Sequence, residues 1–123
     1  MFANTKAFSG FSVNDIEAAK RFYGDTLGIQ VSEENGMLTL HIAGDRPILV
    51  YPKADHTPAT YTILNFPVDD IDSAVDDLIA KGVTFEQYPS GPIKTNEKGI
   101  AHPGPSQAWF RDPAGNIVSV VQD

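Results

Sequence analysis

Residues 12–19 read SVNDIEAA, and a closely related stretch, PVDDIDSA, occupies residues 67–74. Each copy follows an apolar run, places an acidic residue where a helix would be capped, and leads to a glycine, Gly28 or Gly82. A strand followed by a capped helix that ends at glycine is one structural unit. Its recurrence indicates a duplicated module. Two such modules with a shared core would leave a cleft that suits a small molecule.

The spacing of apolar residues predicts the same order of elements in both halves. The expected strands cover residues 7–13, 29–32, 37–42, 47–51, 61–68, 83–87, 107–111 and 117–121, and the expected helices 15–27 and 70–81. Asn35-Gly36 is typical of a hairpin turn. The segment 88–106 is rich in Pro, Gly and Lys and predicts a long loop that contains a short strand. The pattern is βαβββ, twice.

Composition limits the classes of function. The chain has 123 residues and fits one domain, with modules at 1–52 and 60–123 joined by a linker at 53–59. The net charge of −7 argues against nucleic acid as a partner. No apolar run is long enough to span a membrane, and the N-terminus lacks the order of a signal peptide. The absence of cysteine suits a cytoplasmic protein.

Several of these motifs together resemble one known family. They are the two capped helices, the Phe22-Tyr23 pair before Leu27-Gly28, and the turn Asp112-Pro113-Ala114-Gly115-Asn116 between apolar strands. The chain resembles the vicinal oxygen chelate superfamily of glyoxalases, bleomycin-resistance proteins and extradiol dioxygenases. The resemblance implies an α+β fold in which two βαβββ modules form a curled, half-open mixed sheet. It also implies a homodimer.

The resemblance also gives four positions at which the enzymes of this family hold a divalent metal ion. In this sequence the positions fall on Phe8, near Ile48, on Ile63 and on Ser119. Phenylalanine and isoleucine offer no lone pair, and a serine hydroxyl is a weak ligand beside imidazole or carboxylate. A slip of two residues on the third strand gives Asn65, which is also a poor ligand. We therefore expect neither a metal ion nor another cofactor.

Alternation along the strands predicts which side chains line the cavity. If Phe8, Ile48, Ile63 and Ser119 face it, Asn65 and Val50 do so as well. Leu49 and Tyr51 would then face the helices. His41 shares a face with Thr39, so it could line the pocket, or it could lie outside it; the sequence favours neither position.

Trp109 and Arg111 share one face of a strand. Trp109 could stack on a planar ligand, or it could pack on the loop or on a dimer partner. Arg111 could hold a carboxylate or phosphate, or it could pair with a surface acid. His56 and His102 fall in loops, where we expect them to be solvated.

These observations lead to three hypotheses. The first is a metal-independent protein that binds a small apolar or aromatic molecule between the modules, with ligand contacts from Phe8, His41, Ile48, Ile63, Asn65, Trp109, Arg111 and Ser119. The second is a lyase-type or dioxygenase-type enzyme with a site relocated to His41, Asn65 or Arg111, or completed by a partner subunit. The third, a structural module without a ligand, is the least supported.

Overall fold

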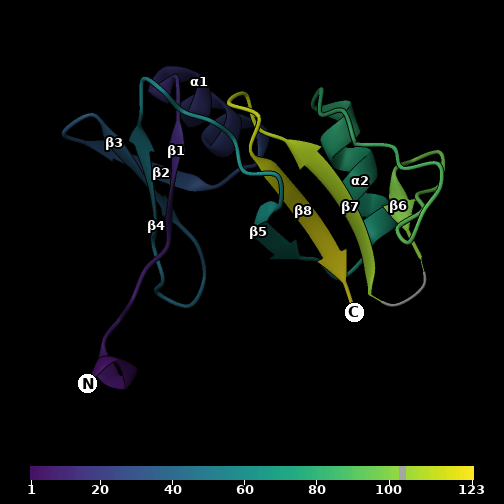
Figure 1. The fold of residues 1–123 in the computed structure, drawn as a ribbon, viewed down its shortest axis with the longest axis horizontal. Helices are drawn as coiled ribbons and strands as arrows, with labels where there is room; N and C mark the ends of the chain where they lie inside the picture. Colours follow the sequence, from purple (N-terminus) through teal and green to yellow (C-terminus); the bar gives the residue numbers. More distant parts are fainter. Residues whose placement is uncertain (103–104) are drawn as a thin grey trace. The chain divides into compact units, whose positions relative to one another are not determined.

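The computed structural model describes residues 1–102 and 105–123, so residues 103 and 104 of the expected loop lie outside the described residues. The chain forms two compact units, Met1–Thr57 and Pro58–Asp123. Each unit contains one four-stranded mixed sheet, and helical segments accompany each sheet (Figure 1). The boundary between the units falls inside the segment assigned to the linker.

The first unit begins with a short 3₁₀ turn, η1, and has its strands in the spatial order β1-β4-β3-β2. Its elements are η1 (Phe2–Asn4), β1 (Gly10–Val13), α1 (Ile16–Arg21), η2 (Phe22–Thr26), β2 (Gln30–Glu34), β3 (Met37–His41) and β4 (Ile48–Pro52). The helix continues from α1 into the π-helical turn η2, so the helical segment ends before Gly28, as expected. β1 runs parallel to β4, whereas β4, β3 and β2 are antiparallel.

The second unit repeats this arrangement in the order β5-β8-β7-β6. Its elements are β5 (Thr62–Pro67), α2 (Ile71–Ala80), β6 (Ile100–Ala101), β7 (Ser106–Arg111) and β8 (Ile117–Gln122). β5 is parallel to β8, and β6, β7 and β8 are antiparallel. The α+β class and the duplicated strand order are therefore confirmed.

The prediction of a strand at residues 83–87 is wrong. Only Phe85 pairs there, in an isolated bridge with Phe110, and the Glu86 N–H donates to the Trp109 carbonyl at 2.8 Å. The loop turns back at Gly99, where a Cβ atom would lie 2.9 Å from the Phe85 Cβ. The outer edge of β7 is therefore paired in two pieces, by residues 85–86 and by β6.

The helix caps and the hairpin turn form as the sequence predicts. Asp15 accepts a hydrogen bond from the Ala18 N–H at 3.1 Å, and Asp70 accepts one from the Ser73 N–H at 3.2 Å. The backbone and hydroxyl donors of Ser73 lower the pKa of the Asp70 carboxyl. Asn35 and Gly36 both have positive φ angles, 55° and 77°, which a tight hairpin between twisted strands requires.

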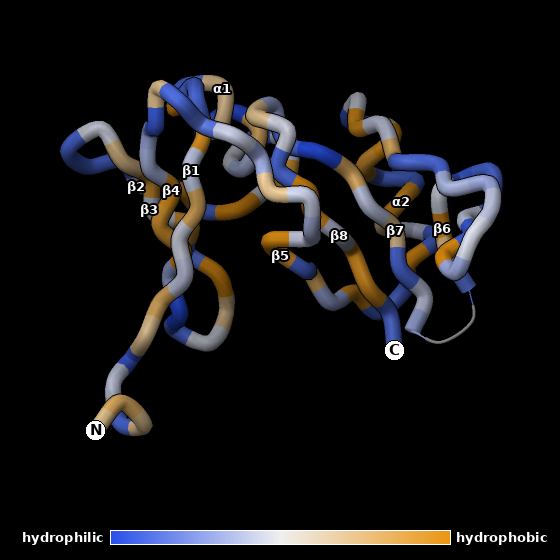
Figure 2. The backbone as a smooth tube through the Cα atoms, viewed as in Figure 1, coloured by the Kyte–Doolittle hydropathy of each residue, from blue (hydrophilic) through white to orange (hydrophobic). Residues whose placement is uncertain are grey.

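Each unit buries its own apolar residues between sheet and helix. In the first unit the ring of Phe11 lies 5.7 Å from that of Tyr23, which is fully buried. In the second, α2 packs on β7 and β8, and Phe110 and Val118 are fully buried (Figure 1). The tube in Figure 2 is correspondingly hydrophobic along much of β8. Each of the two sheets therefore has one face covered by a helix.

The turn between β7 and β8 is built on a buried carboxylate. Asp112 is 4% exposed, and its Oδ1 accepts hydrogen bonds from the backbone N–H groups of Ala114, at 3.0 Å, and Asn116, at 2.8 Å. Its Oδ2 accepts a third from Asn116 Nδ2 at 3.0 Å. Gly115 has a φ of 86°, so this position strongly favours glycine. The turn fixes the register of the two strands that it joins.

We expect Asp112→Ala to lower the free energy of unfolding by about 2–3 kcal/mol, because buried donors lose a charged acceptor. Denaturant unfolding followed by circular dichroism measures this change. Asp77→Ala is the matched control, since Asp77 is exposed on α2. Equal stabilities of the two variants would contradict the structural role given to Asp112.

Candidate ligand-binding site

The second sheet has two chemically different faces. Alternate residues of β5, β7 and β8 turn toward α2, and the register pairs place Leu64, Phe66, Ala108, Phe110, Val118 and Val120 on that side. We call the opposite side the helix-free face of the second sheet. It carries Thr62, Asn65, Gln107, Trp109, Arg111, Ile117, Ser119 and Val121. This face holds four of the predicted ligand contacts: Asn65, Trp109, Arg111 and Ser119.

Three neutral polar side chains form a connected network on this face. Ser119, which is fully buried, donates its hydroxyl to Asn65 Oδ1 at 2.6 Å. Gln107 Nε2 donates to the same Asn65 oxygen at 3.2 Å and to Ser119 Oγ at 3.1 Å. The network joins three strands, since Asn65 is on β5, Gln107 on β7 and Ser119 on β8. It presents amide groups at one position of the face.

Trp109 lies beside this network. It pairs in register with Ser119, and its indole N–H donates to Thr62 Oγ1 at 3.1 Å. The edge-to-face contact with Tyr88 has a centroid distance of 5.8 Å, and only 8% of Trp109 is exposed. Of the alternatives left open by the sequence, packing against the long loop is the one observed. Stacking of a ligand on Trp109 stays a prediction.

Arg111 is paired within its own unit. Its Nε donates to Glu86 Oε1 and its Nη1 to the Gly115 carbonyl at 3.2 Å. The surface-acid alternative is therefore the observed one. Because Glu86 compensates the guanidinium charge, this face offers little attraction to an anion.

The first sheet has an equivalent helix-free face. Register pairing groups Gly10, Ser12, Thr39, Leu49 and Tyr51 on it, and His41 follows Thr39 at the strand's period of two. Its polar side chains are also hydrogen-bonded to one another. His41 Nε2 lies 2.8 Å from Ser32 Oγ, and His56 Nδ1 lies 2.6 Å from Ser12 Oγ. His41 is therefore exposed on this face, and its contact with a ligand stays a prediction.

The predicted orientation of β4 is wrong. Val50 pairs in register with Phe11, whose ring contacts Tyr23 of the helical segment, so Val50 faces the helix. Ile48 shares that orientation, pairs with Leu40 and is 6% exposed. Ile48 therefore belongs to the core. Leu49 and Tyr51 occupy the helix-free face, and Tyr51 is exposed.

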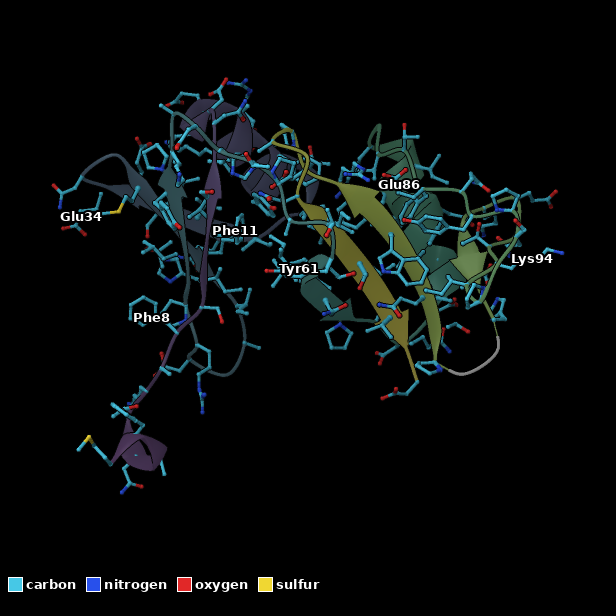
Figure 3. The ribbon with its side chains drawn as sticks, in the orientation of Figure 1. Phe8, Phe11, Glu34, Tyr61, Glu86 and Lys94 are labelled. Carbon is cyan, nitrogen blue, oxygen red and sulfur yellow. The ribbon has the colours of Figure 1, made fainter. Side chains whose placement is uncertain are left out.

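Two further predicted contacts lie at strand ends. Phe8 precedes β1 (Figure 3), and the residue is 65% exposed. Ile63 is the unpaired residue of an irregularity in β5, since Thr62 pairs with Ile117 and Leu64 with Val118. This extra residue brings Thr62, which the sequence analysis did not select, beneath the Trp109 indole. The roles of Phe8 and Ile63 as ligand contacts stay predictions.

Sequence comparison identifies the family. The model of the Glyoxalase/Bleomycin resistance protein/Dioxygenase superfamily matches residues 8–120. The chain belongs to this superfamily. A relative from Bacillus subtilis (strain 168), YraH, is 28% identical over an alignment of 125 positions. The alignment covers 89% of this chain and 91% of YraH.

Solved structures agree with this assignment. TnmS3, an antibiotic binding protein from Streptomyces sp. CB03234, is 25% identical, with a TM-score of 0.68 over 97% of both chains. The integron cassette protein VCH_CASS1 from the mobile metagenome of V. cholerae is 26% identical. Its TM-score is 0.67, and the match covers 99% of this chain and 97% of that one. The chain therefore has the fold of this superfamily as well as its sequence pattern.

The residues at the positions that the sequence analysis assigned to a metal ion do not fit a divalent ion. Phe8, Ile48 and Ile63 supply no imidazole or carboxylate, and the same holds for Leu49, which lies on the helix-free face beside Ile48. Ser119 uses its hydroxyl within the amide network. Within residues 1–102 and 105–123, no three His, Cys, Asp or Glu side chains gather as a metal site would require.

In the same ranges, no helix is long and apolar enough to cross a membrane.

Two site residues, Gln107 and Thr62, were missed by the sequence analysis. Gln107 lies two positions before Trp109 on the same strand, so the alternation that grouped Trp109 with Arg111 would also have selected it. Thr62 had no such signal, because the irregularity between Thr62 and Leu64 changes the alternation locally.

We expect Thr62→Val to lower the free energy of unfolding by about 1–2 kcal/mol, since the buried Trp109 N–H loses its acceptor. Thr62→Ser keeps the hydroxyl and should cost less. The single tryptophan gives one indole N–H signal in NMR, which should shift in the valine variant and stay near its position in the serine variant. An unmoved signal in Thr62→Val would show that the hydrogen bond is absent.

Proposed function

We propose that this protein binds a small, neutral, partly aromatic molecule on the helix-free face of its second sheet, without a metal ion. The single observation that carries this proposal is the Asn65–Ser119–Gln107 network, in which two neutral amides engage Ser119, the residue that the family resemblance assigns to the fourth metal position. Amides and a hydroxyl fix the orientation of a neutral ligand, and neighbouring apolar side chains supply contact area. The similarity to TnmS3, an antibiotic binding protein, supports a role in binding.

The charge distribution of this face supports a neutral ligand. Arg111 is paired with Glu86, and the network itself has no ionisable group. The chain as a whole carries a net charge of −7, which repels anions. A neutral ligand with some apolar surface is therefore the class that these residues accommodate best, because it brings no charge that the face would have to compensate.

The proposal is tested by titrating the protein with neutral aromatic compounds of different ring sizes, using calorimetry and the Trp109 indole N–H signal. We expect saturable binding that is unchanged after treatment with a chelator, because the site has no metal ligands. Elemental analysis of the purified protein provides the control. A tightly bound divalent ion, required for ligand binding, would overturn the proposal, and so would the absence of binding by every compound.

We also propose that the protein forms a homodimer, as its family suggests. Among the described residues, β1, β2 and β5 each pair with one other strand only, so one edge of each has no strand partner. Unpaired edges and the exposed ring of Phe8 are surfaces that a second copy can cover. Sedimentation velocity at micromolar concentration should give twice the chain mass of 13.3 kDa. A mass equal to that of one chain would contradict this proposal.

A further inference from the structure

We propose that the ligand carries a lactam or imide edge, in which a ring N–H and a carbonyl stand side by side, and that Asn65 and Gln107 together recognise this edge. The inference rests on the proposed function, since it names the chemical class of molecule that the face would bind. It follows from which atoms of the network are already used and which are left over.

The amide oxygen of Asn65 accepts from both Ser119 Oγ and Gln107 Nε2, at 2.6 and 3.2 Å. The amide nitrogen of Gln107 serves both Asn65 and Ser119. Within the described ranges, the Asn65 amide nitrogen and the Gln107 carbonyl oxygen have no side-chain or backbone partner. One donor and one acceptor therefore remain, on adjacent side chains of a single face.

Ser119 fixes this pair in place. Its fully buried hydroxyl donates to one amide and accepts from the other, so neither amide turns freely. If both side-chain amides are rotated by 180°, the Ser119 hydroxyl donates to Gln107 and accepts from Asn65. The free acceptor is then on Asn65 and the free donor on Gln107, so the pair still offers one of each. Because the side chains are held before binding, less conformational entropy is lost when a ligand arrives.

A lactam or imide matches this pair because its carbonyl accepts from the free amide N–H while its N–H donates to the free carbonyl. A carboxylate would match poorly, since it brings two acceptors and no donor. Arg111, the cation on the same face, is already paired with Glu86. Val121, which is in register with Gln107 and half-buried, provides apolar surface on this face. The donor and the acceptor that are left over thus favour a neutral ring with a polar edge.

The inference is tested with three probes of similar size: oxindole, which has a lactam edge, N-methyloxindole, which lacks its N–H, and benzoate, which is an anion. Each is titrated into the full-length protein, and the Trp109 indole N–H signal and the side-chain amide signals of Asn65 and Gln107 are followed. We expect oxindole to bind about tenfold more tightly than N-methyloxindole, the effect of one good hydrogen bond. Benzoate should bind most weakly.

Variants locate the recognition. Gln107→Met removes the carbonyl that would accept from the ligand, so oxindole should fall to the affinity of N-methyloxindole while N-methyloxindole changes little. Gln87→Met is the matched control, because Gln87 lies in the loop and donates to the Glu97 carbonyl there, away from the network. Asn65→Asp keeps an acceptor for Ser119 and Gln107 but replaces the free N–H by oxygen. Both lactams should then bind about tenfold more weakly, whereas Asn14→Asp, which adds the same charge elsewhere, should have no such effect.

The outcomes separate this inference from the proposed function. Preference for oxindole that disappears in Gln107→Met supports the lactam edge. Equal binding of the two neutral probes, or loss of preference in Gln87→Met as well, would overturn the inference and leave the proposed function standing. Preference for benzoate would overturn both, because the site would then select anions. The absence of binding by all three probes would overturn both as well.

Discussion

The parallel pairing of β5 with β8 is the constraint on which the site depends. It places Asn65 opposite Ser119, although the two residues come from opposite ends of the second unit, and it allows the 2.6 Å hydrogen bond between them. The same ladder turns Leu64 and Val118 toward α2, because neighbouring residues of a strand point to opposite faces. A shift of one residue would move the polar side chains into the core and the apolar ones out of it. The core of the unit and the polar network are thus two results of one register.

The network also explains how a familiar fold can carry different chemistry. Fold and function are separable because function depends on a few side chains at positions that the fold provides. Here Ser119, the residue that the resemblance assigned to a metal position, has its hydroxyl engaged by two amides. The charged residues near this face neutralise each other in the pair of Arg111 and Glu86. What remains is a surface of hydrogen-bonding groups without ionic character.

Local signals in the sequence predicted most of the elements. The caps at Asp15 and Asp70, the turn at Asn35-Gly36 and the alternation along β7 and β8 act within a few residues, and each appears in the structure. The faces of β4 were predicted incorrectly because Ile48, Leu49 and Val50 are all apolar. Hydrophobicity therefore gives no alternation to read there. Only the pairing of Val50 with Phe11 decides which of them is core.

By itself, the sequence determined the duplication, the order of most strands and helices, and the superfamily, since these follow from residue types and their spacing. Tertiary structure alone decided the partners. It brought Gln107 to Asn65 and Ser119, and it gave the Trp109 indole its acceptor in Thr62. It also paired Arg111 with Glu86, and it left only an isolated bridge where a strand was expected at 83–87. The reason is physical. A hydrogen bond between distant residues depends on register, and register depends on how whole strands pack, which no short stretch of residues encodes.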